Sequence, residues 1–197
     1  MTEPDLSGAD ALLVIDVQRD FLPGGALAVP GGDRVLAPLQ RCLDRFAKRG
    51  RPVFMTRDWH PADHCSFTDH GGSWPVHCVA GTPGAAFATV LRIPAQAQLV
   101  SKGTHPRAEG YSAFGATDLC ARLRHQGIQR LWVGGLATDY CVLQSVLDAC
   151  SLGFDVRVIT DAVAAVDLAP GDGTRAIERM KAAGAALTTS EEVVSAG

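Results

Sequence analysis

The sequence predicts an α/β fold of three layers, in which helices flank both faces of a doubly wound, mostly parallel sheet. Short runs of apolar residues alternate along the chain with stretches of helical periodicity, as is typical of α/β proteins. The runs are apolar almost throughout, as expected for parallel strands that are buried on both faces. A glycine also follows each helical stretch, where it would end the helix.

The expected strands begin and end where the apolar runs do. The first contains LLVI, the second VFM and the fourth LWV, and short apolar runs of this kind favour strands over helices. We expect strands over residues 11–17, 52–57, 98–101, 130–134 and 155–160.

The expected helices lie between these strands and after the last one. Pro38 does not fit the first helix beyond its first turn, because proline has no backbone N–H to donate. That helix is therefore expected to start later than Asp33 suggests. The helices span residues 34–48, 118–126, 139–152 and 174–183, and the glycines that end them are Gly50, Gly127, Gly153 and Gly184.

Length and composition predict one domain over residues 1–197. Of these residues 47% are hydrophobic and 20% charged, which is ordinary for a compact protein with one large core. We expect residues 1–10, which are acidic and polar, to be flexible. Residues 58–97 are rich in Gly, Pro, Ser and His and lack periodicity, and a loop of this length inside a domain is usually functional.

Charge, the N-terminal residues and the cysteines exclude several classes of protein. The formal net charge is -3 and the basic residues are scattered, so we expect no nucleic-acid partner. The N-terminus lacks a secretory signal, and no apolar run approaches the ~20 residues of a membrane helix. We therefore expect a cytoplasmic protein without membrane contacts, either a monomer or a homo-oligomer. The six cysteines follow no disulfide-scaffold spacing and are expected to be reduced.

Metal-binding side chains gather in the segment 58–97. Asp58 and His60 form an Asp-x-His pair, and His64 and His77 follow. Carboxylate and imidazole are ligands of divalent transition metals, and Asp-x-His spacing in an extended segment can direct both side chains at one ion. We therefore interpret this segment as a metal-binding active-site loop.

Two other interpretations of this loop remain open. Cys65 and Cys78 directly follow His64 and His77, and zinc favours thiolates, so the loop could hold a structural zinc ion. The chain has no CxxC pair, however, and adjacent ligands are awkward to bring to one ion. The histidines could also lie at the surface without a metal, because motif matches carry false positives.

Several reactive side chains directly follow the expected strands. Asp16 ends the run LLVI, Lys102 follows QLVS, and Cys141 lies just past RLWVG. Asp58 and His60 follow PVFMTR. Because open α/β sheets bind ligands along the edge where the carboxyl ends of the strands meet, we expect these five residues to converge.

Cys141 is the expected nucleophile. A cap at Thr138 or Asp139 would place it in the first turn of a helix, where free amides and the positive helix end favour a thiolate. A Lys102 ammonium would add to that effect. The alternative is that Cys141 packs against the sheet like Cys150 of the same helix, because free cysteines are often buried. The small residues of the preceding GGLATDY favour the nucleophile, since they let a substrate approach the backbone.

Asp16 suits a role in proton transfer. Because it ends an apolar run, burial should raise its carboxyl pKa, and an ammonium such as that of Lys102 would lower it again. The simpler alternatives are an exposed strand-end carboxylate and a solvated lysine.

Six segments together resemble one known family. They are IDVQRDFLPGGALAV, RDWHPADHCSF, SWPVHCVAGTPGA, SKGT, YSAFGATDL and GGLATDYCV. In their order and relative positions they resemble the nicotinamidases, within the isochorismatase-like cysteine hydrolase superfamily, over about residues 11–180. The resemblance implies the isochorismatase-like form of the three-layer fold.

The resemblance also implies the roles of particular residues. Asp16, Lys102 and Cys141 match its catalytic triad. Its oxyanion hole is formed by backbone N–H groups, here those of Ala137 and Cys141, next to a cis peptide that would be Leu136–Ala137.

One divalent metal ion is implied, held by Asp58, His60 and His77, with His64 as a candidate fourth ligand. Zinc is the first choice, and manganese and iron are alternatives, because this ligand set does not discriminate among them. Tyr140 falls at a position that we regard as variable. The substrate pocket is implied to be lined by Phe21, Leu27, Trp74 and Tyr111, although aromatic residues also pack in cores.

The implied activity is the metal-dependent deamidation of nicotinamide to nicotinate and ammonia through a cysteine thioester, within NAD salvage. Pyrazinamide, a close ring analogue, should also fit. One alternative is another cysteine hydrolase of the superfamily, such as an isochorismatase-like or ureido-amide hydrolase, which would share the triad but generally lacks the metal ligands. The other is a non-catalytic metal-binding or interaction module, which would bind a metal but release no ammonia.

Overall fold

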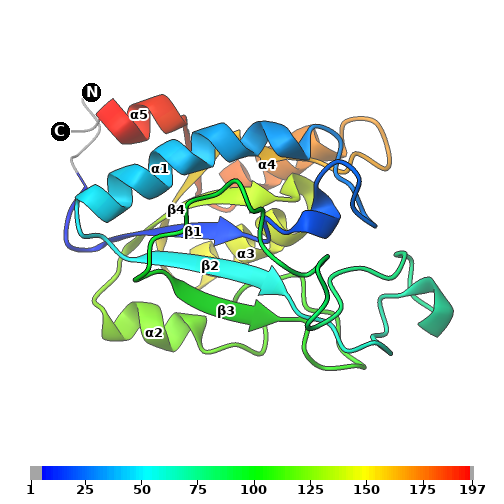
Figure 1. Cartoon of the computed structure of the whole chain (residues 1–197). Coiled ribbons are helices and arrows are strands. Elements are labelled where there is room, and N and C mark those ends of the chain that lie inside the picture. Colours follow the sequence, from blue (N-terminus) through cyan, green and yellow to red (C-terminus); the bar gives the residue numbers. More distant parts are fainter. Residues whose placement is uncertain (1–5, 196–197) are drawn as a thin grey trace.

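A parallel sheet forms the centre of the molecule. The computed structural model describes residues 6–195, and within them six strands form one sheet in the order β3-β2-β1-β4-β5-β6, with each neighbouring pair parallel (Figure 1). The predicted sheet is confirmed, and its pairs are all parallel. The strands are β1 (Asp10–Ile15), β2 (Val53–Asp58), β3 (Gln98–Lys102), β4 (Arg130–Leu136), β5 (Asp155–Ala164) and β6 (Ala186–Thr188).

Helices cover both faces of this sheet. α1 (Leu36–Lys48) and α5 (Ser190–Ser195) pack on one face. The other face is covered by α2 (Leu119–His125), α3 (Leu143–Ser151) and α4 (Asp172–Ala182). Figure 1 shows α1 and α5 above the sheet and α2 below it. The three layers expected from the sequence are therefore present.

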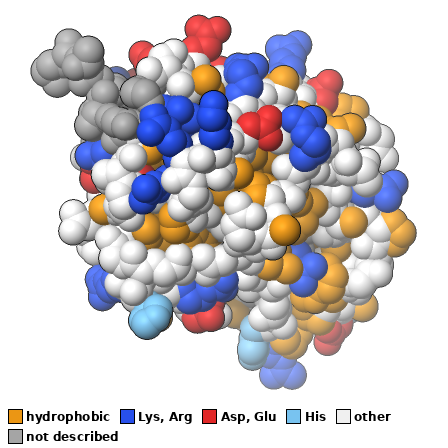
Figure 2. Space-filling model, turned by 60° about the vertical axis from the view of Figure 1, so that its left-hand side comes forward, with side chains coloured by type: hydrophobic (Ala, Val, Ile, Leu, Met, Phe, Trp, Pro, Cys, Tyr) orange, Lys and Arg blue, Asp and Glu red, His pale blue; other side chains and the backbone are white. Residues whose placement is uncertain are grey.

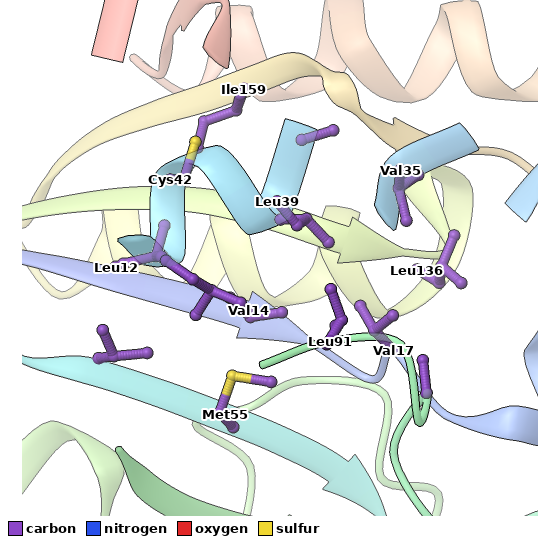
Figure 3. Packing of buried hydrophobic residues seen from close by; sticks show 14 of the residues in the cluster. Leu12, Val14, Val17, Val35, Leu39, Cys42, Met55, Leu91, Leu136 and Ile159 are labelled. Carbon is purple, nitrogen blue, oxygen red and sulfur yellow. The ribbon is translucent and has the colours of Figure 1, made fainter. Parts of the chain in front are cut away.

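The two faces of the sheet bury separate apolar layers, because successive strand residues point to opposite sides. Leu39 and Cys42 of α1 pack over Leu12, Val14 and Met55 of β1 and β2 (Figure 3). All five side chains are at most 1% exposed, and a large apolar side chain buried in this way contributes about 1.5–3 kcal/mol. This packing fixes the strands whose carboxyl ends carry the candidate site.

The helix ends agree with the glycine pattern. Each of the four glycines expected to end a helix has a positive φ, from 61° to 104°, which lets the chain leave the helix in the left-handed conformation. α1 begins at Leu36. Pro38 therefore lies in the first turn, where a missing N–H removes no intrahelical hydrogen bond. The late start expected for this helix is confirmed.

Some segments differ from expectation. A π-helix (Thr138–Val142) precedes α3, so the helix expected from residue 139 has two parts. β6 and α5 have no counterpart among the expected elements, because strands of three residues and helices of six carry too little periodicity. Of the segment 1–10, residues 1–5 lie outside the described residues, whereas Leu6 is buried and Asp10 begins β1.

The strand order reverses between β1 and β4. β2 and β3 lie on one side of β1, whereas β4, β5 and β6 lie on the other. Open α/β sheets bind ligands outside the carboxyl ends of their strands at such a switch point. The topology therefore directs attention to the ends of β1 to β4.

Charged side chains of both signs are mixed on the surface shown in Figure 2, as the scattered basic residues of the sequence predict. On the face shown in Figure 2, Lys and Arg side chains lie among acidic and apolar ones. Within residues 6–195, no helix has both the length and the apolar composition that crossing a bilayer requires.

Candidate active site

Four candidate residues lie at the carboxyl ends of four neighbouring strands. Asp58 is the last residue of β2, and Lys102 is the last residue of β3. Asp16 directly follows β1 and has a φ of 47°, in the left-handed region. Cys141 lies in the π-helix that follows β4. The structure thus brings these residues to one edge of the sheet.

Lys102 stands at the centre of this group. Its Nζ lies 2.8 Å from Asp16 Oδ2 and 2.6 Å from Asp58 Oδ1. It also donates to the Gly110 carbonyl at 2.9 Å and lies 3.3 Å from Cys141 Sγ. Burial disfavours the ammonium, but the two carboxylates outweigh it, so the pKa of Lys102 lies well above its usual range. A fixed positive charge therefore lies beside the sulfur.

Asp16 is fully buried, and its two oxygens have different surroundings. Oδ1 accepts a hydrogen bond from Thr56 Oγ1 at 2.6 Å. Oδ2 faces the Lys102 ammonium, but no donor among the described residues is aligned on it. Burial raises the pKa of the Asp16 carboxyl, and Lys102 opposes that rise. Since a carboxylate oxygen of Asp16 lies within 4.8 Å of Cys141 Sγ, this side chain is arranged to accept the thiol proton.

The surroundings of Cys141 raise the pKa of its thiol, whereas a helix end and a nearby ammonium alone would favour the thiolate. Burial raises the pKa of Cys141, the Lys102 ammonium lowers it, and the carboxylates of Asp58 and Asp16 raise it again, so that it lies well above its usual range. The sulfur therefore needs a base before it can attack.

The expected helix cap is wrong. Ala137 occupies the N-cap position of the π-helix, and neither Thr138 nor Asp139 caps it. The Asp139 carboxylate instead accepts hydrogen bonds from the backbone N–H groups of Val166 and Asp167, at 3.0 and 2.9 Å. This side chain therefore joins the π-helix to the segment after β5.

The backbone before Cys141 runs close to β1. A Cβ at Gly135, whose φ is 128°, would overlap the backbone of Ile15, so only glycine fits there. The Leu136–Ala137 peptide bond, which follows shortly after Gly135, is cis, as expected. Ala137 and Cys141 line the same cavity.

Asp58, His60 and His77 bring three candidate ligand atoms within 4.8 Å of one another. His60 Nδ1 lies 2.9 Å from the Gly103 carbonyl O, and His77 Nδ1 lies 2.8 Å from that of Pro75. Because a carbonyl can only accept, Nδ1 carries the proton in both rings, and each Nε2 has a free lone pair. Asp58 Oδ2 lies 3.6 Å from His60 Nε2. One carboxylate and two imidazoles fit a divalent transition metal with open coordination positions.

His64 lies beside these ligands but is engaged elsewhere. Its ring stacks on that of His60, with centroids 4.1 Å apart. Its Nε2 lies 3.1 Å from the Ala108 carbonyl O, and its Nδ1 lies 2.7 Å from Ser66 Oγ. Both ring nitrogens have partners, so the arrangement favours three protein ligands over four.

The two cysteines of the loop do not join the candidate metal ligands. In the part of the chain that the structure describes, neither Cys65 nor Cys78 joins a group of metal-binding side chains. Both are free thiols, as are the other four cysteines. The geometry therefore disfavours a structural zinc site built on them.

One cavity, called here the first cavity, opens onto both the sulfur and the metal ligands. Cys141, Asp58 and His77 all line it, and the empty space in and around its opening is about 350 Å³. The other lining residues are Phe21, Leu27, Trp74, Tyr111 and Ala137, which the sequence singled out, and Val29, Tyr140 and Val166, which it did not.

Tyr140 belongs to an aromatic cluster in the first cavity. Its ring lies edge-on to that of Trp74, with centroids 4.9 Å apart, and 5.7 Å from that of Tyr111. Trp74 Nε1 donates to Tyr111 Oη at 2.8 Å. Tyr140 is therefore part of the cavity wall, and its position next to Cys141 is the signal that could have identified it.

Gln18 is another residue that the sequence did not single out. Its buried side chain pairs with the backbone of Asp58 as a strand would, because Oε1 accepts from the Asp58 N–H and Nε2 donates to the Asp58 carbonyl, both at 2.8 Å. Nε2 also donates to the Ala85 carbonyl at 2.9 Å. Gln18 thus holds Asp58, a candidate metal ligand, in place.

Comparison with known proteins agrees with this site. The isochorismatase domain model matches residues 10–192. A nicotinamidase of Escherichia coli (strain K12) is 42% identical over 200 aligned positions, covering 91% of this chain and 94% of that protein.

Two solved structures are also similar to the chain. A pyrazinamidase of Pyrococcus horikoshii in complex with zinc has a TM-score of 0.88 and 45% identity, covering 92% of this chain and 99% of the other. PnC1 from L. infantum in complex with nicotinate has a TM-score of 0.89 and 36% identity, covering 98% of both chains. The chain belongs to the isochorismatase family.

Proposed function

We propose that the protein is a metal-dependent amidohydrolase that converts nicotinamide to nicotinate and ammonia through a thioester on Cys141, and that it also accepts pyrazinamide. The observation that carries the proposal is that one cavity is lined by both the Cys141 sulfur and the metal ligands Asp58 and His77. Relatives with similar sequences include nicotinamidases, and a similar structure contains nicotinate.

The first half of the reaction forms the thioester. Asp16 takes the proton of the Cys141 thiol, and the Lys102 ammonium stabilises the resulting thiolate. The thiolate attacks the carboxamide carbon and an oxyanion forms. The backbone N–H groups of Ala137 and Cys141 stabilise this oxyanion, to which one such donor contributes about 3 kcal/mol in other hydrolases. Protonated Asp16 then gives its proton to the departing ammonia.

The second half of the reaction frees the enzyme. Asp16, ionised again, takes a proton from a water molecule that attacks the thioester. The bond between carbon and Cys141 Sγ breaks, nicotinate leaves, and the thiol regains a proton from Asp16. One carboxyl therefore acts as base and acid in both halves.

Asp58, His60 and His77 would hold the metal, and we propose zinc. A bound metal would orient the pyridine nitrogen, directly or through water, so that the carboxamide lies over the sulfur. Zinc is favoured over manganese and iron because the similar pyrazinamidase structure contains zinc, although the ligand set alone does not discriminate among these ions. The protein's own contribution is to keep both Nε2 lone pairs free for the ion.

We further propose that residues 1–197 act as a single domain. The protein would work in the cytoplasm, in NAD salvage, without nucleic-acid or membrane partners, as a monomer or a homo-oligomer.

A coupled assay of ammonia release tests the activity, with nicotinamide, pyrazinamide and a ureido substrate compared at equal concentration. We expect turnover of the first two and none of the third. Cys141→Ala should abolish turnover while zinc content, measured by elemental analysis, stays unchanged. Turnover confined to the ureido substrate would favour another cysteine hydrolase. Bound zinc without ammonia release from any substrate would indicate a non-catalytic metal-binding module.

A further inference from the structure

A second cavity also reaches the metal ligands. It shares Asp58, His77, Trp74 and Tyr111 with the first cavity, and the empty space in and around its opening is about 250 Å³. The hydrogen bond from Trp74 Nε1 to Tyr111 Oη, at 2.8 Å, ties together two side chains that both cavities contact. The residues that line only the second cavity are His60, His64, Ser66, Glu109 and Gly110.

The two cavities differ in chemistry. The walls that belong only to the first are mostly apolar, such as Phe21, Leu27 and Val29, and they suit a flat ring. The walls that belong only to the second are imidazole, hydroxyl, carboxylate and backbone groups. Such polar groups suit a hydrated cation, which can exchange its water molecules for them one at a time.

Glu109 is placed to meet a cation at the entrance of the second cavity. Its side chain is exposed although it lines the cavity. Its backbone is held on both sides, because the Ala108 carbonyl accepts from His64 Nε2 at 3.1 Å and the Gly110 carbonyl accepts from Lys102 Nζ at 2.9 Å. The backbone of Glu109 is therefore held near the candidate metal ligands, while its carboxylate is exposed to solvent.

We propose that the metal ion enters and leaves through the second cavity, with Glu109 attracting the hydrated cation at its mouth, while the substrate occupies the first cavity. The inference rests on the proposed metal site. It implies that the protein exchanges its metal even when the first cavity is filled.

The first test fills the first cavity and measures the loss of metal. Zinc-loaded protein is treated with benzyl methanethiosulfonate, which leaves a benzyl disulfide on Cys141 and carries no metal-binding nitrogen. Zinc release to an excess of a chromogenic chelator is then timed. Cys141→Ala protein treated in the same way is the matched control. The reagent can modify its other accessible cysteines, but no benzyl group can fill (plug) the first cavity. We expect equal release rates, and slower release from the plugged protein would overturn the separate route.

The second test removes the charge at the mouth. Glu109→Gln should slow the association of zinc with the metal-free protein by about two- to fivefold at low ionic strength, and the difference should vanish in high salt. Glu191→Gln, which removes an exposed carboxylate outside both cavities, is the control and should leave the rate unchanged. Equal rates for the two variants would overturn the role of Glu109.

The outcomes separate this inference from the proposed function. If the unmodified protein binds no zinc, the metal site itself is wrong and the route with it. If the protein binds zinc but the benzyl group on Cys141 slows zinc release, the metal site is supported and only the proposed route is wrong.

Discussion

At the scale of single residues, the site is organised around one ammonium. Lys102 Nζ lies 2.6–3.3 Å from two carboxylates and a sulfur, and burial together with the two carboxylates raises the pKa of the Cys141 thiol despite the ammonium. A helix end and a lysine beside Cys141 suggest a preformed thiolate from the sequence alone. Burial and two neighbouring carboxylates reverse the result, and neither can be measured from the order of residues. Activity should therefore depend on a base.

Asp16→Asn tests this dependence. Asparagine keeps the size of the side chain but cannot take the thiol proton, so we expect kcat/KM for nicotinamide to fall by about 10²- to 10⁴-fold. Ammonia release measures the loss, and zinc content and circular dichroism check that the site is intact. Asp63→Asn, at an exposed position, is the control. Activity within tenfold of the unmodified protein would contradict the assignment of the base.

Gln18→Glu tests the support of the metal ligand Asp58. The change replaces the Nε2 donor by an oxygen that faces the carbonyls of Asp58 and Ala85. We expect the free energy of unfolding to fall by about 1–3 kcal/mol, and zinc affinity to fall as well. Urea denaturation and zinc titration measure both quantities. Gln129→Glu, at an exposed position, should change neither, and unaltered zinc affinity in Gln18→Glu would remove the positioning role.

At the scale of elements, the segment after β3 reaches the site through two glycines in contact. A Cβ on Gly103 would meet the ring of His60, and a Cβ on Gly110 would meet the Cα and N of Gly103. The contact lets the Gly110 carbonyl reach Lys102 and places Tyr111 in the first cavity. Close backbone approach is therefore a condition of the site.

Gly110→Ala should disrupt this contact. The methyl group forces the two segments apart, and a displacement near 1 Å at a catalytic site can lower the rate by about 10²-fold. Steady-state kinetics with nicotinamide measure the effect. Gly115→Ala is the matched control, because a Cβ there meets Ser112 only at 3.5 Å or more. Equal activity of the two variants would show that the contact is dispensable.

The elements that the sequence predicts well are the strands that contain a run of apolar residues. All five expected strands are present, and β4 and β5 extend to Leu136 and Ala164. The π-helix could not be expected, because its backbone differs from an α-helix without a change of residue type. The Gly103–Gly110 contact was equally hidden, since it joins two segments whose separation in space no periodicity encodes.

At the scale of the whole molecule, the sheet edge and the loops after its strands form the site together. The strand-end rule brought Asp16, Asp58, Lys102 and Cys141 to this edge correctly. The lining residues Val29, Tyr140 and Val166 were not predictable in this way, because ordinary apolar and aromatic side chains carry no signal that distinguishes a cavity wall from a core.

Removal of the metal should be visible in the stability of the whole chain. We expect one cooperative unfolding transition, seen alike by tryptophan fluorescence and circular dichroism, as for one domain. At a zinc concentration about 100 times Kd, chelation should lower Tm by about 5–10 °C. His77→Ala should show no zinc-dependent shift. An equal shift in that variant would place the stabilising ion elsewhere.

Asp58 has one oxygen directed at Lys102 and the other towards His60. The same carboxylate therefore contacts both the lysine beside the sulfur and a candidate metal-binding histidine, so a substitution of Asp58 would affect both parts of the site. Variants at position 58 will combine two defects, whereas substitution of Lys102 removes only the partner of Oδ1 and substitution of His60 only the partner of Oδ2.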